Sequence, residues 1–585
     1  MRTTAISVLV LVSLFALLSE AWLAEDAAIT LRAVENLYLT QGPVYNPGEK
    51  TEVFTHPLWF STLVIFRGMG LDSSYVAVIL GLLLSLAGLL LMIRTPARSE
   101  NNEAPFRYLH LIIPFLLAAH PGFRQFGASG MELGLLSVLL GLFYLKLENH
   151  RPVEKPVLLG FLLGLMYLTR PELGLFAVWY GFFFLWELAR ERHLGKRQIL
   201  WRAARAAISI LVTAGSWHLF RYLYFGELFP NTYYAKAGLD SYWLQGAKYL
   251  FHAVFFGPTS WVILLMVAAY GYLVYFNSPT TESVNEKRRD WFRLVRDLGA
   301  PIIMTLYVIR LGGDFMAFRF LLPELIMLAW LARRLFTIPL PTRWNGALSK
   351  WDGRPSRTLA VFAAASVIAL FIPIPAAKGY IANERFHFVS KFERKGPGLI
   401  EAENHPWGAR GEELSRFQSC LNYRTFRIAN SQAEARCMEG MGLGYVGLAA
   451  GPYVEIIDEQ GISDPYVARL PILLRFRPGH EHSIGTLEVL AKDVLFCNTG
   501  DRKYDEIMST RYGTVVRWDP DFLALVPDID ERLARLQEYK REGSPAIEML
   551  EARYGITVEE LQARKEMWSS EYVRQKRQCW TEDSQ

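Results

Sequence analysis

The sequence has few cysteines, and none of them comes early. All four, Cys420, Cys437, Cys497 and Cys579, follow residue 375, so the first 375 residues form no disulfide and no thiolate metal site. The spacings of the four do not match a zinc-binding pattern. Because an even number of cysteines in one segment is typical of an oxidising compartment, we expect one or two disulfides there, with the pairing open.

Charged residues are also scarce. Asp, Glu, Lys and Arg make up 20% of the 585 residues, whereas 51% are hydrophobic and 14% are aromatic. This composition is too apolar for an ordinary soluble enzyme. Apolar runs of membrane-spanning length predict a polytopic α-helical membrane protein with about eleven transmembrane helices. The runs of spanning length are 4–23, 74–94, 172–189, 203–219, 256–276 and 357–374, and shorter or polar-interrupted candidates are 107–120, 131–147, 156–168, 297–311 and 319–335.

The distribution of Lys and Arg predicts the orientation, because basic residues in short loops stay on the cytoplasmic side. The most basic loops are 94–98, 190–205, 287–296 and 333–357. If Arg2 is also cytoplasmic, all of these loops lie inside, and everything after residue 375 lies outside. We therefore expect a multi-pass protein of a bacterial plasma membrane with a cytoplasmic N terminus and an extracytoplasmic C terminus. The net charge of +5 then reflects topology and requires no nucleic acid.

The first apolar run also fits a cleaved signal peptide. Arg2 would be its basic region, and the small residues near Ala24 would be the cleavage site. A run of about twenty residues that leads into a polar segment suits a retained membrane anchor better. We expect the run to be retained.

The segment 376–585 has a different character from the membrane domain predicted over residues 1–375. Short runs typical of strands, YVGLAA, YVEIID, DVLFC and GTVVRW, alternate with turns, and residues 528–575 are charged with a helical period. We expect a small extracytoplasmic α/β domain that ends in helices. No phosphate loop, nucleophile elbow or metal cluster is recognisable in its sequence.

Two adjacent carboxylates, Glu25 and Asp26, follow the first apolar run. On a helix, Glu25 shares a face with Arg32 and Asn36. The simple interpretation is that these residues solvate the end of a span, where ionisable groups are otherwise costly. The following stretch, QGPVYNPGEKTEVFTHPLW at 41–59, contains turn formers and aromatic residues. It indicates an ordered external loop, at about residues 24–73, in place of a simple connector.

The array EDAAITLRAVEN, VYNPGE and THPLW resembles the first external loop of the GT-C superfamily of glycosyltransferases. The resemblance is to the mycobacterial terminal arabinofuranosyltransferase family and to related flagellar motor control proteins. Further stretches match in order: SGMELGL, LTRPELG, FPNTYYAK, GGDFMAFRFLLP and GISDPYVARLP. The family usually begins the loop with two aspartates, and Glu25 departs from that pattern. Asp26 is therefore the better candidate for a catalytic base.

The resemblance implies a GT-C fold and the transfer of a sugar, arabinofuranose in that family, from a polyprenyl-phosphate donor. The acceptor would be a glycan or lipid-linked glycan of the cell envelope, at the outer face of the bilayer. Asp26, with Glu25 beside it, would accept the proton of the acceptor hydroxyl. Cationic side chains would stabilise the departing phosphate. The implied substrate-binding residues are Arg32, Asn36, His56, Trp59, Glu132, Arg170, Glu172, Asn231, Tyr233, Tyr234, Lys236, Asp314, Arg319 and His480.

Several of these residues have simpler interpretations. Arg170 at the end of a span also suits contact with lipid headgroups. Tyr233 and Tyr234, with Asn231, also suit an aromatic belt. Asp314 also suits an ion pair with Arg319 alone.

His480 suits contact with the acceptor, but a lone histidine in a soluble domain is more often a surface or packed residue. Glu25 and Asp26 supply few oxygens for a divalent cation, so we expect no required cofactor, while a cation stays possible.

Two other functional classes also remain. One is a transporter or flippase, although no inverted repeat is visible. The other is a non-catalytic assembly factor of the envelope or the flagellar motor.

Overall fold

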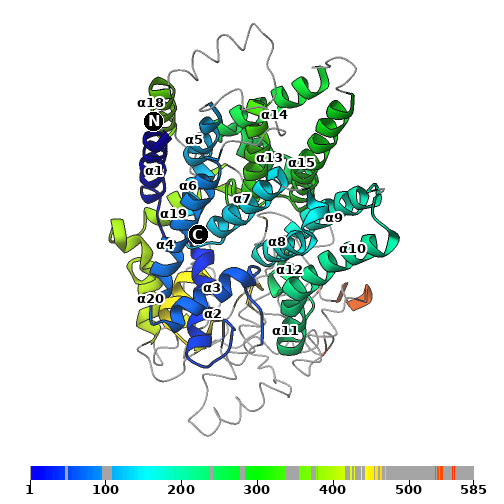
Figure 1. Cartoon of the computed structure of the whole chain (residues 1–585). Helices are drawn as coiled ribbons and strands as arrows, with labels where there is room; N and C mark the ends of the chain where they lie inside the picture. The colour runs from blue at the N-terminus through cyan, green and yellow to red at the C-terminus, as the bar shows by residue number, and fades with distance from the viewer. Residues whose placement is uncertain are drawn as a thin grey trace.

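The computed structural model describes a mostly helical chain with a few two-residue strands (Figure 1). His480, Cys420, Cys497 and Cys579 lie outside the described residues, and so does most of the segment 528–575. The disulfides therefore stay a prediction. The described residues are 2–46, 50–94, 109–149, 151–191, 193–236, 241–276, 284–337, 355–370, 377–378, 380–415, 422–423, 427–428, 436–437, 442–452, 455–456, 458, 461–463, 468, 478, 534, 537–538, 540–543, 557 and 559.

Helices account for nearly all of the regular structure. The α-helices up to residue 225 are α1 (Arg2–Leu18), α2 (Glu25–Tyr38), α3 (Pro57–Gly68), α4 (Ser73–Leu91), α5 (Ile112–Ala119), α6 (Pro121–Gly127), α7 (Leu133–Asn149), α8 (Pro156–Thr169), α9 (Leu173–Ala189), α10 (Lys196–Ile210) and α11 (Ser216–Phe225). Those that follow are α12 (Asn231–Lys236), α13 (Trp243–Phe255), α14 (Pro258–Phe276), α15 (Val284–Leu311), α16 (Leu322–Ala332), α18 (Pro355–Leu370), α19 (Glu384–Val389), α20 (Pro406–Ser415) and α21 (Leu443–Ala450).

Short helical turns and strands complete the described structure. The turns are η1 (Leu109–Leu111), η2 (Pro152–Glu154), the π-helical η3 (Leu211–Gly215), η5 (Arg319–Leu321), η6 (Arg333–Thr337), η7 (Gly396–Ile400) and η8 (Ala402–Asn404). The strands are β1 (Ala377–Lys378), β2 (Ile381–Ala382), β3 (Asn422–Tyr423), β4 (Arg427–Ile428), β5 (Arg436–Cys437) and β6 (Glu455–Ile456). Strands β1 and β2 pair antiparallel, as do β4 and β5, whereas β3 and β6 pair parallel.

Every apolar run that we predicted to span a membrane is helical over most of its length. Among the described residues, three helical segments are long and apolar enough to cross a membrane: Ser73–Leu91, Lys196–Phe225 and Pro258–Phe276. Shorter apolar helices are Ile6–Leu18, Leu109–Ala119, Pro156–Thr169 and Leu173–Ala189. These helices are consistent with a membrane protein, and the number of spans stays a prediction.

Close contacts at two glycines hold α8 against α10 and η3. A Cβ atom at Gly160 would lie 2.3 Å from the carbonyl oxygen of Ala206, and one at Gly164 would lie 1.8 Å from the hydroxyl oxygen of Thr213. The two glycines are four residues apart and therefore share one face of α8. This is the small-residue packing by which helices approach closely within a bilayer.

Two described elements after residue 376, α21 and β6, pack directly on the first loop. The hydroxyl of Tyr445 in α21 donates to the carbonyl of Leu23 at 2.6 Å, and the amide nitrogen of Asn46 donates to the carbonyl of Ile456 at 2.8 Å. Figure 1 shows α2, α3 and α20 together at one end of the molecule. Residues from both sides of the predicted boundary at 376 thus share one packed region.

The run YVGLAA forms most of helix α21, so our prediction of a strand there is wrong. A Cβ at Gly444 would lie 1.9 Å from the carbonyl oxygen of Glu25, and one at Gly447 would lie 2.1 Å from the hydroxyl of Tyr45. Positions three apart share a face only in a helix, so the helical state lets both glycines meet the first loop. The run YVEIID does contain strand β6.

Candidate active site

Helix α2 begins at the two carboxylates. Its N-cap, Ala24, has extended backbone angles and no side-chain cap, while Glu25 and Asp26 lie in the first turn, where the helix dipole favours negative charge. Helix α1 ends at Leu18, so the pair belongs to a separate helix that follows the first apolar helix. The sequence prediction of a polar helix face here is confirmed.

The two neighbouring carboxylates have different surroundings. Glu25 is 8% exposed and accepts the backbone N–H of Gly444. Burial, followed by the negative charge of Asp26, raises the pKa of Glu25 to about 8. The Asp26 side chain is 19% exposed, and its Oδ2 accepts a hydrogen bond from Nη1 of Arg319 at 2.7 Å. Of the two carboxylates, Asp26 is therefore the one that combines a cationic partner with a solvent-accessible side chain.

Arg319 reaches Asp26 from the turn η5, at the end of the stretch GGDFMAFR. The same Nη1 lies 3.7 Å from Oδ2 of Asp314 and 3.2 Å from the sulfur of Met316. Asp314 is 2% exposed. Burial raises the pKa of Asp314, while the charges of Arg319 and Lys236 oppose the rise, so Lys236 belongs to the same electrostatic environment. The arginine thus lies between two carboxylates from distant parts of the chain.

The backbone of this stretch needs its two glycines. Gly312 and Gly313 have φ angles of 95° and 78°, which residues with a Cβ rarely adopt. A Cβ at Gly313 would also lie 2.3 Å from the ring of Tyr249. The buried Tyr249 hydroxyl donates to the carbonyl of Met316 at 3.0 Å and accepts the N–H of Phe320 at 3.1 Å. Tyr249 therefore fixes the turn that carries Arg319.

A second group of charged residues lies beside the first. Nη1 of Arg170 lies 3.4 Å from Oε1 of Glu132, and Nε of Arg170 donates to Glu172. The guanidinium groups of Arg170 and Arg319 lie 5.5 and 5.7 Å from the centre of the Phe320 ring. Because both cations contact one aromatic side chain, the two groups are immediate neighbours.

His56 connects this second group to α2. Its Nδ1 lies 3.7 Å from Oε2 of Glu132, and its Nε2 forms a hydrogen bond with the hydroxyl of Thr30 at 3.0 Å. Burial lowers the pKa of His56, and the nearby Glu132 opposes this effect. We therefore expect a neutral imidazole at neutral pH, with a positioning role at the inner side of α2.

The structure thus brings half of the predicted site residues into one neighbourhood, which we call the charged cluster. Its members come from six separate stretches of the matched motifs. They are Asp26, His56, Glu132, Arg170, Glu172, Lys236, Asp314 and Arg319.

Other predicted site residues donate hydrogen bonds to backbone carbonyls. Arg32 donates to Tyr45 at 2.7 Å and to Gly447 at 2.6 Å, and Asn36 donates to Tyr45 at 2.8 Å. Arg32 is also 1% exposed. These two side chains hold the loop after α2 in shape, and this structural use leaves them little capacity to bind a substrate.

Trp59 and Asn231 join the matched motifs to one another. The indole N–H of Trp59 donates to the carbonyl of Gly130 at 3.0 Å, and the amide of Asn231 donates to the carbonyls of Gly461 and Ile462 at 2.7 and 3.0 Å. The stretches THPLW and SGMELGL are connected in this way, and so are FPNTYYAK and GISDPYVARLP.

The predicted tyrosines lie on α12. Tyr233 is 45% exposed and stacks on Phe229 with ring centres 4.6 Å apart, and the Tyr234 ring meets Tyr233 edge-on. Their rings form an aromatic group beside Lys236 in sequence. Both interpretations, sugar contact and aromatic belt, remain compatible with this position.

Sequence reasoning missed residues that the structure places next to the charged cluster. Gly444 and Tyr249 position Glu25 and the turn of Arg319, and nothing in the local sequence signals contacts over such separations. Glu324 is 2% exposed, and both of its carboxylate oxygens lack a hydrogen-bond partner among the described residues. Glu324 directly follows the matched stretch GGDFMAFRFLLP, and this position was the sequence signal that could have identified it.

Within the described ranges, no three His, Cys, Asp or Glu side chains are arranged to hold a metal ion. Asp26 pairs with the Arg319 guanidinium, at 2.7 Å. The arrangement therefore offers a carboxylate proton acceptor next to fixed positive charge, which suits a reaction that moves a proton and develops negative charge nearby.

Comparison with known proteins confirms the resemblance inferred from the motifs. The chain is 30% identical over 333 residues to a terminal β-(1→2)-arabinofuranosyltransferase of Mycobacterium tuberculosis, covering 52% of this chain and 51% of the relative. It is 27% identical over 339 residues to a protein of the same name from Corynebacterium glutamicum, covering 52% and 46%. The chain thus matches about half the length of these curated relatives.

No protein-family model and no solved structure matches the chain. The likeness to flagellar motor control proteins stays a prediction.

Proposed function

We propose that the chain is a membrane glycosyltransferase that moves a sugar from a polyprenyl-phosphate donor to a glycan hydroxyl at the outer membrane face. Arabinofuranose is the proposed sugar because both relatives are named for its transfer. The observation that carries the proposal is the Asp26 to Arg319 pair, 2.7 Å apart and partly exposed, within the charged cluster. It supplies both groups that such a transfer requires.

The proposed reaction exchanges one bond at the anomeric carbon of the sugar. The acceptor oxygen forms a bond to that carbon, and the bond from the carbon to the phosphate oxygen breaks. Asp26 takes the proton from the acceptor hydroxyl, which makes the oxygen a better nucleophile. The lipid phosphate leaves with the bonding electrons, and its added negative charge falls near Arg319 and Lys236.

Donor binding would also prepare the base. Nη1 of Arg319 contacts both Asp26 and Asp314, so a phosphate that approaches this guanidinium competes with the carboxylates for it. Once Arg319 turns to the phosphate, Asp26 is free to face the acceptor hydroxyl. Arg170 has Glu132 and Glu172 as close partners, and we assign it to positioning of the cluster.

Glu25 has a separate role in this proposal. It is buried and holds the N–H of Gly444, so it anchors the start of α2 and fixes the direction of Asp26. The family usually has two aspartates here, and the replacement of the first by Glu25 then changes the anchoring residue and leaves the proposed base, Asp26, unchanged.

The test uses the full chain in liposomes with a radiolabelled polyprenyl-phosphate arabinofuranose donor and an arabinan oligosaccharide acceptor. We expect label in the oligosaccharide, and no label when the donor is polyprenyl-phosphate mannose. Arg319→Lys should lose most of the transfer, because Lys lacks the planar fork that binds phosphate. Arg67→Lys is the matched control, since Arg67 pairs with Glu35 at 2.9 Å outside the cluster. Folded wild type that transfers sugar from neither donor would refute the proposal.

A further inference from the structure

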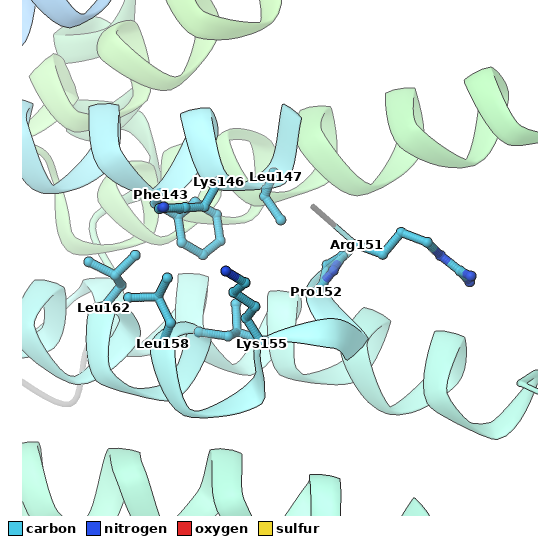
Figure 2. A pocket seen from close by; sticks show the side chains of 9 residues that line it. Phe143, Lys146, Leu147, Arg151, Pro152, Lys155, Leu158 and Leu162 are labelled. Carbon is cyan, nitrogen blue, oxygen red and sulfur yellow. The ribbon is translucent and has the colours of Figure 1, made fainter. Parts of the chain in front are cut away.

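A shallow, open pocket lies between α7 and α8. Its walls are mostly apolar, with Phe143 from α7 and Leu158 and Leu162 from α8, and three cationic residues line it as well: Lys146, Arg151 and Lys155. Figure 2 shows the leucines pointing from α8 toward α7, with the Lys155 side chain reaching into the space between the helices. Figure 2 also shows Arg151 extending away from the pocket.

We infer that this pocket binds the phosphate headgroup of an anionic glycerophospholipid, with part of an acyl chain against the leucines and Phe143. The occupant follows from two properties that occur together: an apolar wall and uncompensated positive charge. A sugar or nucleotide would leave the apolar wall unused. A neutral lipid would leave the cations without a partner.

The positive charge comes mainly from the two lysines. Arg151 already pairs with Glu191. Lys146 and Lys155 are exposed, and neither has an ion-pair partner among the residues that the structure describes. Glu154 next to Lys155 is exposed and is not among the lining residues. Two lysine ammonium groups therefore remain available for a phosphate.

The start of α8 adds to this preference for an anion. Lys155 occupies the N-cap position, and Pro156, which has no N–H, is the first helical residue, so Val157 and Leu158 carry the N–H groups that lie outside the helix's own ladder. The first turn of a helix carries free N–H groups and partial positive charge. The nearby helix α10 contributes Arg202, which donates to the carbonyl of Val153 at 2.9 Å. Arg202 does not line the pocket, but it places a further cation next to the carbonyl that follows the lining residue Pro152.

The pocket lies at the end of α7 and α8 opposite to the charged cluster. Glu132 immediately precedes α7 and Arg170 immediately follows α8, whereas Lys146 and Lys155 are at the other ends of the same helices. A rise of 1.5 Å per residue separates Leu133 from Lys146 by about 20 Å. In the predicted topology this end faces the cytoplasm, so the lipid belongs to the inner leaflet. Basic pockets between helices on that side suit anionic headgroups.

The test measures lipid binding by the purified full chain in detergent, using native mass spectrometry. The probes are phosphatidylglycerol, phosphatidylcholine and inorganic phosphate. The variant is Lys146→Gln with Lys155→Gln, which removes both free charges from the pocket. The matched control is Lys196→Gln with Arg197→Gln, because these two exposed residues at the start of α10 carry the same total charge outside the pocket.

We expect wild type and the control to bind phosphatidylglycerol equally, and the pocket variant to bind it roughly thirtyfold more weakly. Phosphatidylcholine should bind wild type no better than it binds the pocket variant. Equal binding of phosphatidylglycerol by all three proteins would overturn the inference. So would inorganic phosphate that occupies the site as tightly as the lipid does, because the apolar wall would then contribute nothing. Equal unfolding temperatures without lipid verify that the variants are folded.

Discussion

Replacing Glu25 by glutamine should stabilise the protein at alkaline pH. Glutamine keeps an oxygen that accepts the N–H of Gly444 and has nearly the same volume, but it carries no charge. In the wild type, burial and the neighbouring Asp26 raise the pKa of Glu25 from 4.5 to about 8. The buried site therefore favours the neutral form, which Glu25→Gln makes permanent.

The sign and size follow from proton linkage. An acid with a raised pKa in the folded state binds more protons there than in the unfolded state, so the folded state is favoured at low pH and loses this advantage as pH rises. For Glu25 the loss begins near pH 4.5 and is complete above about pH 8. A tenfold change in proton affinity corresponds to about 1.36 kcal/mol, so the total loss of folding free energy is on the order of 5 kcal/mol.

The assay is thermal unfolding in detergent, followed by tryptophan fluorescence between pH 5 and pH 9. The wild type should lose stability over this range relative to Glu25→Gln, and the two curves should converge at the acidic end. Glu35→Gln is the control, because Glu35 lies on the same helix and pairs with Arg67 at 2.9 Å. If the difference between wild type and Glu25→Gln is constant across the pH range, Glu25 does not titrate as argued.

Other predictions test the packing and the topology. Gly444→Ala should destabilise the fold by about 1–3 kcal/mol and reduce transfer, because its Cβ would lie 1.9 Å from the carbonyl oxygen of Glu25. The control is Gly181→Ala, at a helical position with open space around it. This control should leave the unfolding temperature almost unchanged. Thiol counting on denatured, unreduced protein should find fewer than four free thiols among the cysteines after residue 375, and four would refute the disulfides. A C-terminal reporter that works only in the cytoplasm should be silent, and an active one would contradict the proposed orientation.

The elements of the fold that depend on hydropathy were predictable from the sequence. Long apolar runs with few charges can be recognised without knowledge of the tertiary packing. Each predicted run is helical over most of its length. The charged cluster was partly predictable for a related reason. Asp26, Arg170 and Arg319 lie at the ends of apolar runs that the basic-loop rule assigns to one side, and side chains on one side of a helical bundle can meet.

The contacts between distant segments were not predictable. Glu25 and Gly444 are 419 positions apart, and no local pattern signals that a backbone N–H will reach that carboxylate. Arg32 and Asn36 share a face with Glu25, as predicted, yet they bind the loop backbone, because the turn at 44–46 folds back onto α2. The helix α21 was mistaken for a strand because its Val and Tyr favour strands locally, whereas its glycines are needed for contact with α2.

The comparison of Asp26→Asn with Glu35→Gln tests the central claim most directly. Both substitutions remove one carboxylate charge from α2, and each carboxylate is partly exposed and paired with an arginine, Arg319 and Arg67 respectively. Transfer of arabinofuranose from the polyprenyl-phosphate donor is measured at equal amounts of folded protein. We expect Asp26→Asn to lose transfer on the order of a hundredfold or more and Glu35→Gln to remain close to wild type. Asp26→Asn with nearly wild-type turnover would contradict the assignment of Asp26 as the base.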